Sequence, residues 1–206
     1  MKNIIVIDKF YEKPELVRDY ALTKAQYLTN EKLAPNFLGT ESIHSFTTSS
    51  VIKKIEKAIG KKIIVDPKKF SFGVFAKTEQ TDQHKKEIHV DSSEWTGIVY
   101  LNLPYQCAGG TCFYQHKSTG LNAMPSKNQL KQLGYHDTED FRKNFLQPRA
   151  QNSDEWDVSV KIGMKFNRLV LFRAGELFHA AENYFGSAET ACRLTQLFFF
   201  QTQETT

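Results

Sequence analysis

The first third of the chain repeats its hydrophobic residues with the period of an α-helix. A short apolar run at 3–7 predicts a strand. Apolar residues then recur at helical spacing, which predicts a helix over about 14–28 with a proline in its first turn. A second helix is predicted to begin at a serine cap, Ser49 or Ser50, and to end at the next glycine. Residues 1–69 are therefore expected to form an N-terminal strand and supporting helices.

From residue 70 onward the hydrophobic period shortens to two, which is typical of strands. No helices alternate with these strands, which argues against a parallel α/β sheet, and the sequence has neither a GxGxxG loop nor a P-loop. Short strands with tight turns instead predict a sandwich or jelly roll. The expected strands are 70–74, 88–90, 97–103, 111–114, 156–166, 169–172, 177–181 and 191–201.

One segment, 116–154, interrupts the strand pattern. Two short helices are predicted in it, each opened by a serine or threonine. We interpret it as a partly helical insertion and as a candidate substrate lid, because lids complete many enzyme sites. The stretches on either side, 70–115 and 155–201, are expected to form the jelly-roll core of a single domain, 1–206. The predicted fold class is mostly β with flanking helices.

Composition narrows the class of protein without naming a function. The chain has 206 residues, no apolar run long enough for a membrane span, and three cysteines without a CxxC pair, so a cytoplasmic protein is expected. The 16 phenylalanines and 8 tyrosines predict an aromatic core. The net charge is +4, and many of the lysines lie between residues 53 and 69. They flank isoleucines at helical spacing with no aromatic between them, which argues against nucleic-acid binding.

The segment His89-Val90-Asp91 is the first candidate for chemistry. In a strand, residues i and i+2 point to the same face, so both side chains can converge on one metal ion; the alternative is an exposed strand end. His179 lies in an apolar strand, where its alternative is a hydrogen-bonded core histidine. Two histidines and one carboxylate leave a face of the metal open, as in non-haem Fe(II) oxygenases.

Arg193 lies in the last apolar strand, 14 residues after His179. A buried guanidinium needs a partner, because an unpaired charge is costly in an apolar interior. A ligand carboxylate held by two hydrogen bonds would supply that partner. The alternative is an ion pair within the protein, for instance with Glu176 or Glu182.

Four other polar residues are candidates for contacts in a site. Tyr100 and Asn102 share one face of their strand, which suits a strand that lines a wet cavity; the alternative is a solvent-facing side. His116 follows a predicted strand and is a candidate for substrate contact. His84 lies in a charged loop, where it is either a second such candidate or simply exposed to solvent.

Taken in order, these segments resemble the double-stranded β-helix of Fe(II)/2-oxoglutarate-dependent dioxygenases, with the prolyl-4-hydroxylase-like and phytanoyl-CoA-hydroxylase-like branches the most similar. The N-terminal segments 7–11 and 14–18 resemble an uncharacterised bacterial and phage branch of the same superfamily. The motifs that carry the resemblance are His89-x-Asp91, Tyr100-Leu101-Asn102, Gly109-Gly110-Thr111-x-Phe113, the run from Asn167 to Phe172, His179 and Arg193.

The resemblance implies iron ligands, a co-substrate and a reaction. It implies that His89, Asp91 and His179 hold Fe(II), and that Arg193 pairs with the distal carboxylate of 2-oxoglutarate. The same resemblance implies hydrogen bonds from Tyr100 and Asn102 to the co-substrate, and O₂ as the oxidant.

The resemblance also bears on the substrate. The expected partner is a small-molecule or peptide substrate that becomes hydroxylated. Prolyl hydroxylases use a lysine at a closer spacing than Arg193, which argues against a prolyl substrate, and the presence of Asp91 favours hydroxylation over halogenation.

Two other function classes stay open. One is a cupin-like metal-binding jelly roll of different activity, although such proteins usually carry more histidine ligands. The other is a non-catalytic binding module from a phage or bacterium. An intact metal triad together with Arg193 argues against the second.

Overall fold

The computed structural model describes residues 3–28, 38–187 and 191–203. The strands are β1 (Ile4–Ile7), β2 (Thr40–Glu41), β3 (Ile63–Ile64), β4 (Phe72–Thr78), β5 (Trp95–Tyr100), β6 (Gly110–His116), β7 (Trp156–Gly163), β8 (Leu169–Phe172), β9 (His179–Ala181) and β10 (Arg193–Thr202). The helices are α1 (Pro14–Thr23), α2 (Ser49–Ile59), α3 (Lys127–Gln132), α4 (Thr138–Phe141) and α5 (Gln147–Arg149), with a π-helical turn η4 (Arg142–Leu146) and short 3₁₀ turns η2 (Gln80–Lys85), η3 (Pro104–Gln106) and η5 (Ser153–Glu155). None of the helices in these described ranges has the length and apolar character needed to cross a bilayer.

Two antiparallel sheets make up the centre of the molecule. The larger has seven strands in the order β1-β8-β5-β10-β4-β2, with β3 paired to β10, and the smaller has the order β7-β6-β9. The last strand, β10, lies in the middle of the large sheet between β4 and β5. The prediction of a mostly β protein with flanking helices is therefore confirmed.

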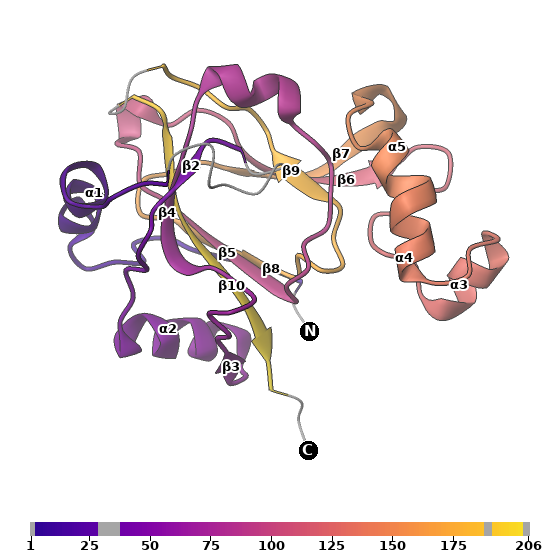
Figure 1. Cartoon of the computed structure of the whole chain (residues 1–206), viewed down its shortest axis with the longest axis horizontal. Helices are drawn as coiled ribbons and strands as arrows, with labels where there is room; N and C mark the ends of the chain where they lie inside the picture. Colours follow the sequence, from indigo (N-terminus) through magenta and orange to yellow (C-terminus); the bar gives the residue numbers. More distant parts are fainter. Residues whose placement is uncertain (1–2, 29–37, 188–190, 204–206) are drawn as a thin grey trace.

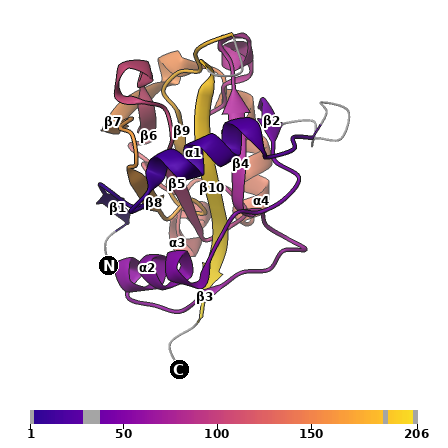
Figure 2. The ribbon, with the colours of Figure 1, turned by 90° about the vertical axis from the view of Figure 1, so that its left-hand side faces the viewer.

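Helices cover the outer sides of both sheets. Helices α1 and α2 lie across one face of the large sheet (Figure 2), and their apolar residues pack on alternate residues of its strands in the largest core cluster. The small sheet lies on the other side, and the helices of the 116–154 insertion pack beyond it (Figure 1). A third cluster, with Tyr100, Phe113 and Phe172 at its centre, joins the two sheets.

The two N-terminal helices form near the predicted positions, with corrected ends. The cap of α2 is Thr48 and not Ser49 or Ser50: its hydroxyl accepts a hydrogen bond from the Val51 backbone N–H at 3.3 Å. Helix α1 ends at Thr23, short of the predicted residue 28. The chain beyond it is extended, and Tyr27 there pairs with Ser42 in an isolated bridge.

A bulge in β4 changes which of its side chains share a face. The alternation of the sequence predicts Phe72 and Val74 on one side, but the register against β10 slips by one residue at Gly73. Gly73 has φ of 87°, and a side chain there would press against the Phe46 carbonyl. The slip turns Phe72 and Phe75 together into the core beneath the helices.

Two other predicted strands differ from the observed ones. The apolar alternation over 156–166 predicts a buried face, but β7 is an edge strand in which Val158 and Val160 are 53% and 41% exposed. An edge strand packs on one side only, so period two does not by itself mean burial. Residues 88–90 form no regular strand; they pair with β9 through a single bridge between His89 and His179.

Candidate functional site

Three side chains from two separate segments meet at the inner side of the small sheet. His89 and His179 form a bridge in which each backbone N–H donates to the carbonyl of the other, at 3.0 and 2.9 Å. Asp91 lies two residues further on, with its backbone N–H bonded to the Ala174 carbonyl. One ligand atom of each of the three residues lies within 4.8 Å of the others, so the structure brings together the predicted metal ligands.

Backbone carbonyls fix the tautomer of both histidines. The Nδ1 atom of His89 lies 2.8 Å from the Glu87 carbonyl, and that of His179 lies 2.9 Å from the Leu177 carbonyl. A carbonyl oxygen only accepts, so each Nδ1 carries a proton, and each ring in its neutral form presents a lone pair at Nε2. Metal-binding histidines have this arrangement, in which the second ring nitrogen donates to a carbonyl.

Asp91 completes the set of ligand atoms. Its Oδ1 lies 3.4 Å from Nε2 of His89 and 3.7 Å from Nε2 of His179, while its Oδ2 accepts a hydrogen bond from the Thr96 hydroxyl. The carboxylate is thereby oriented, with one oxygen held by Thr96 and the other directed at the two imidazoles. Thr96 is the second residue of β5, and its side chain points from the large sheet into the space between the sheets.

The charge states suit a divalent cation. Burial lowers the pKa of His179 to about 4, and the nearby charge of His89 acts in the same direction. Burial alone would raise the pKa of Asp91, but the charge of His179 and the hydrogen bond with His89 outweigh it and lower the pKa to about 2. At neutral pH the site therefore presents an ionised carboxylate beside a neutral His179. Burial opposes a rise at His89, but the hydrogen bond with Asp91 and the charge of that residue raise the pKa of His89, so a bound metal would displace a proton there.

A cavity of about 500 Å³ adjoins these three residues. Its size lies within the range of roughly 300–1,000 Å³ that is typical of small-molecule sites. The large sheet lines it through inward-facing residues of β4, β5 and β10, and the small sheet through β6 and β9. The insertion contributes one helical face to the wall, formed by Arg142, Leu146, Gln147 and Ala150.

Arg193 also lines this cavity, at the start of β10, and it is only 6% exposed. Its Nε is buried without a hydrogen-bond partner among the described residues. Thr78, its neighbour in the register of β4, has a buried hydroxyl in the same condition and lines the same cavity. Two unpaired buried polar groups side by side at a cavity wall indicate a polar ligand group between them.

The ion pair considered as an alternative for Arg193 does not form. Glu176 pairs with Arg173, and Glu182 pairs with Lys161. Across the ranges that the structure describes, Arg193 makes no ion pair at all; its guanidinium lies 5.7 Å from the ring centre of Tyr100.

Tyr100 and Asn102 lie beside Arg193 rather than at the triad. The Tyr100 hydroxyl is 2.7 Å from the Thr111 hydroxyl, and burial raises the pKa of this tyrosine. The Asn102 amide donates to the Cys192 carbonyl at 2.8 Å and accepts from the Leu194 N–H at 2.7 Å. Asn102 thus holds the backbone on both sides of Arg193. Neither residue is among those that line the cavity, and their predicted contact with a co-substrate stays a prediction.

The remaining histidine candidates lie away from the cavity lining. His116 is 2% exposed and packs between Phe145 and Trp156, within the core that joins the insertion to the small sheet. His84 is exposed in the 3₁₀ turn η2. Their predicted substrate contacts have no support in this geometry.

Other residues of the sequence motifs have structural positions. Asn167 bonds both backbone polar groups of Tyr11, at 2.8 Å each, and Arg168 pairs with Asp8. Gly110 leaves no room for a side chain against the Ile162 carbonyl of β7. These residues fix the strands that surround the site.

Sequence reasoning missed three residues of the site. Thr96 could have been found, because the alternation that places Tyr100 on the inner face of β5 extends back through Ile98 to Thr96. Thr78 lies on the far side of the β4 bulge, which the sequence does not reveal. Arg142 lies in the insertion, whose docking on the site has no sequence signal.

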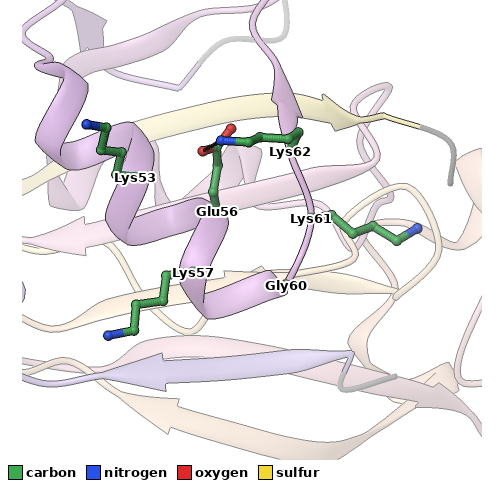
Figure 3. Close-up of a pocket in the computed structure, with 6 residues that line it drawn as sticks. All are labelled: Lys53, Glu56, Lys57, Gly60, Lys61 and Lys62. Atoms are coloured by element: carbon green, nitrogen blue, oxygen red, sulfur yellow. Dashed lines mark hydrogen bonds and ion pairs between the residues drawn. The ribbon is translucent and has the colours of Figure 1, made fainter.

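A second hollow of about 460 Å³ lies over the C-terminal part of α2. Figure 3 shows Lys62 turned toward Glu56, to which it is bonded at 2.8 Å, whereas Lys53, Lys57 and Lys61 point away from one another. Lys53 and Lys57 thus lie on the wet face of α2 that the sequence indicated, and Lys61 and Lys62 follow the end of the helix.

Several solved structures match most of the chain. HygX from Streptomyces hygroscopicus, in a crystal structure with nickel and 2-oxoglutarate bound, is 11% identical, with a TM-score of 0.44 over 96% of this chain and 82% of that chain. A structure of HygX with nickel, 2-oxoglutarate and hygromycin B bound is 10% identical, with a TM-score of 0.45 over the same shares. The crystal structure of IDO from Bacillus thuringiensis is 13% identical, with a TM-score of 0.43 over 98% of this chain and 92% of that chain.

The sequence comparisons give a family. No curated protein matches the chain significantly. The family described as "Family of unknown function (DUF6445)" matches residues 1–200, which is nearly the whole sequence. The chain therefore belongs to the DUF6445 family.

Proposed function

We propose that this protein is an Fe(II)- and 2-oxoglutarate-dependent dioxygenase that hydroxylates a small metabolite, an amino acid or a peptide side chain. The proposal rests on one observation, which is that a metal-ligand triad and an unpaired arginine face the same cavity. His89, Asp91 and His179 direct three ligand atoms at one point, and the same cavity is lined by a buried arginine whose Nε has no partner among the described residues. The first feature suits a metal with open positions, and the second suits a carboxylate.

The donor set fits Fe(II). Two imidazole nitrogens and one carboxylate oxygen are the ligands of non-haem Fe(II) oxygenases, and they leave further positions for co-substrate and O₂. A structural zinc site would require a fourth protein ligand, and the three described ligand residues have none beside them. The carbonyl bonds at both Nδ1 atoms and the Thr96 bond to Asp91 orient all three ligands.

The rest of the cavity fits 2-oxoglutarate. Arg193 and Thr78 would hold its distal carboxylate, with Asn102 fixing the backbone on both sides of Arg193. The other end, a carboxylate beside a keto oxygen, would bind at the metal. When bound, iron, 2-oxoglutarate and O₂ supply the oxidising power that turns a substrate C–H into C–OH, with succinate and CO₂ as the other products.

Other residues of the chain would shape the cavity around the substrate. Leu197 and Phe199 of β10 and Ile98 of β5 give the cavity an apolar wall, which would help to exclude water from an oxidising site. The two facing sheets with the site between them support the assignment of a double-stranded β-helix. The insertion lies at the opposite wall through Leu146 and Ala150, which supports its role as a substrate lid in a single domain.

The direct test uses spectroscopy and product formation. Anaerobic addition of Fe(II) and 2-oxoglutarate is expected to give a weak visible charge-transfer band, and admission of air is expected to release succinate. A chain that binds metal but gives neither band nor succinate contradicts the proposal and favours the cupin-like alternative. A chain that binds no metal favours the non-catalytic module.

Two substitutions separate the roles of metal ligand and co-substrate ligand. Asp91→Ala is expected to abolish iron binding, whereas Asp157→Ala, on the exposed strand β7, leaves it unchanged. Arg193→Leu is expected to raise the 2-oxoglutarate concentration for half-saturation by at least about tenfold, since one charge-assisted carboxylate contact is lost, while iron still binds. The matched control is Arg149→Leu, which removes an arginine outside the cavity. Equal loss of iron in the Asp91 and Arg193 variants would refute the assignment.

A further inference from the structure

A second arginine reaches the metal site from the insertion. Arg142 begins the π-helical turn η4, and it lines the cavity together with Leu146, Gln147 and Ala150. Single π-helical turns are rare and occur frequently at functional sites. The turn lies between α4 and α5, and it places Arg142 beside the loop that carries Asp91, where its Nη2 lies 3.3 Å from the Asp91 carbonyl.

The rest of the fold gives the Arg142 side chain few polar partners. That single, long hydrogen bond to a backbone carbonyl is its one polar contact among the described residues. Glu139, one turn earlier in α4, is exposed and forms no ion pair with Arg142, and two other acids of the insertion are engaged elsewhere. Asp137 caps α4 and bonds His136, and Asp140 bonds the His136 backbone and Asn144. Glu87, the other acid of the cavity wall, is exposed and accepts from the Gln151 amide at 3.0 Å.

The charges of the proposed metal and co-substrate also leave Arg142 without an ion-pair partner. A divalent metal is balanced by Asp91 and by the carboxylate of 2-oxoglutarate that binds it. Arg193 is balanced by the distal carboxylate. Glu87 is the remaining anion of the described cavity wall, but no ion pair joins it to Arg142, which is left without a directly bonded counter-ion. A guanidinium at a cavity wall that makes only one long hydrogen bond is best satisfied by an anion that it binds through two hydrogen bonds.

We infer that Arg142 binds a carboxylate of the substrate, and that the substrate is therefore a small carboxylic acid. The inference rests on the proposed function, because it takes Arg193 as the site of the co-substrate. Anchored by Arg142 on the insertion, such an acid would extend into the cavity toward the metal. Arg142 is thus a specificity-determining residue, and the insertion carries it.

The test compares acids with their uncharged amides. The enzyme is loaded with diamagnetic Zn(II) and 2-oxoglutarate, and binding is measured by ligand-observed NMR. The probes are hexanoate with hexanamide, benzoate with benzamide, and N-acetyl-L-leucine with its amide. We expect at least one acid to bind about tenfold more tightly than its amide, since one charge-assisted contact is lost.

Variants assign that preference to one residue. Arg142→Gln is expected to abolish it, and Arg142→Lys to keep part of it, because lysine retains the charge without the planar fork. The control is Lys143→Gln, which removes an exposed cation from the next position and leaves the preference intact. Equal binding of acid and amide in every pair, or an unchanged preference in Arg142→Gln, overturns the inference.

The outcomes distinguish this inference from the proposed function. If the Fe(II)–2-oxoglutarate band forms in the wild type but is lost in Arg142→Gln, Arg142 serves the co-substrate and the inference is wrong. If the band is absent from the wild type, the proposed function fails first. The comparison of acid and amide does not depend on that band, so the two results are read separately.

Discussion

At the scale of single residues, the two histidines are prepared by the same local device. Each Nδ1 bonds the carbonyl of the residue two positions earlier, Glu87 for His89 and Leu177 for His179. An extended backbone places that carbonyl within reach, so the segment that carries each histidine also sets its tautomer. The bridge between the two backbones then places the centres of the two imidazole rings 4.4 Å apart. The metal-binding form of the site thus follows from backbone geometry.

A substitution at Thr96 tests how far the hydrogen bond that orients Asp91 contributes to metal affinity. Thr96→Val keeps the shape of the side chain but removes the hydrogen bond to Asp91 Oδ2, so the carboxylate loses its orientation. We expect metal affinity to fall by about 10–100-fold, as is typical for such partners of metal ligands, with little change in stability. Calorimetric titration with Fe(II) or Co(II) measures it, and Thr23→Val, at an exposed hydroxyl on α1, is the control. Unchanged affinity in Thr96→Val would contradict the role.

At the scale of elements, the insertion is held by an aromatic cluster. Phe141 is fully buried and stacks on Phe145 with ring centres 4.6 Å apart, and Phe145 contacts His116 of β6. These contacts set the position of the π-helical turn and therefore of Arg142. The element that carries the inferred substrate contact depends on packing that lies outside the cavity.

Removal of the Phe141 ring tests that packing. Phe141→Ala is expected to cost about 3–5 kcal/mol of unfolding free energy, because it leaves a cavity in a close-packed cluster. Leu133→Ala, at a partly exposed position of the same insertion, is expected to cost much less. Urea denaturation measures both. Similar losses for the two variants would show that the cluster is not what holds the insertion.

The strand β1 is attached through a charged contact beyond its end. Hydrogen bonds from Arg168 and Lys165 hold the pKa of Asp8 well below its usual range. A lowered folded-state pKa contributes stability that is complete above about pH 4 and is lost as the pH falls toward the folded-state value. We expect Asp8→Asn to flatten the decline of stability below pH 4, by a modest amount because the pair is partly exposed. Urea titrations from pH 6 to pH 2 test this, with Asp19→Asn as the control; an equally steep decline in Asp8→Asn would contradict it.

The elements show what the sequence alone could predict. Helix α2 was recognisable because its apolar residues keep the helical period, and strand β8 because its four residues form an unbroken apolar run. The bulge at Gly73 and the exposed edge strand β7 were not, because pairing partners and not local pattern decide them. The run Phe198–Phe200 shows the same limit. The sequence predicted an aromatic core without saying which rings join it: Phe198 and Phe200 face the core under the helices, whereas Phe199 lines the cavity.

At the scale of the whole molecule, the site is assembled from distant parts of the chain. His89 and Asp91 lie between β4 and β5, whereas His179 lies in the small sheet and Arg193 opens the central strand of the large one. The sequence could name these four residues by type and order. It could not place Thr78 or Arg142 in the same cavity, since only the packing of sheet on sheet and of the insertion on both brings them there.

This arrangement predicts a large effect of ligands on global stability. A metal at His89, Asp91 and His179 would join a loop to the small sheet, and 2-oxoglutarate would connect that metal to Arg193 in the large sheet. A ligand that binds the folded state alone adds about 2.7 kcal/mol at a concentration 100 times its Kd. For a chain of this size, that corresponds to a rise in Tm of about 5–10 °C.

Scanning calorimetry under anaerobic conditions measures this effect. We expect Co(II) alone to raise Tm and 2-oxoglutarate to raise it further only when Co(II) is present, because the co-substrate needs both the metal and Arg193. Asp91→Ala is expected to lose both increments, and Arg193→Leu to lose the second alone. An increment from 2-oxoglutarate that persists without metal, or in Arg193→Leu, would show that the molecule binds elsewhere and that the two sheets are not linked through this site.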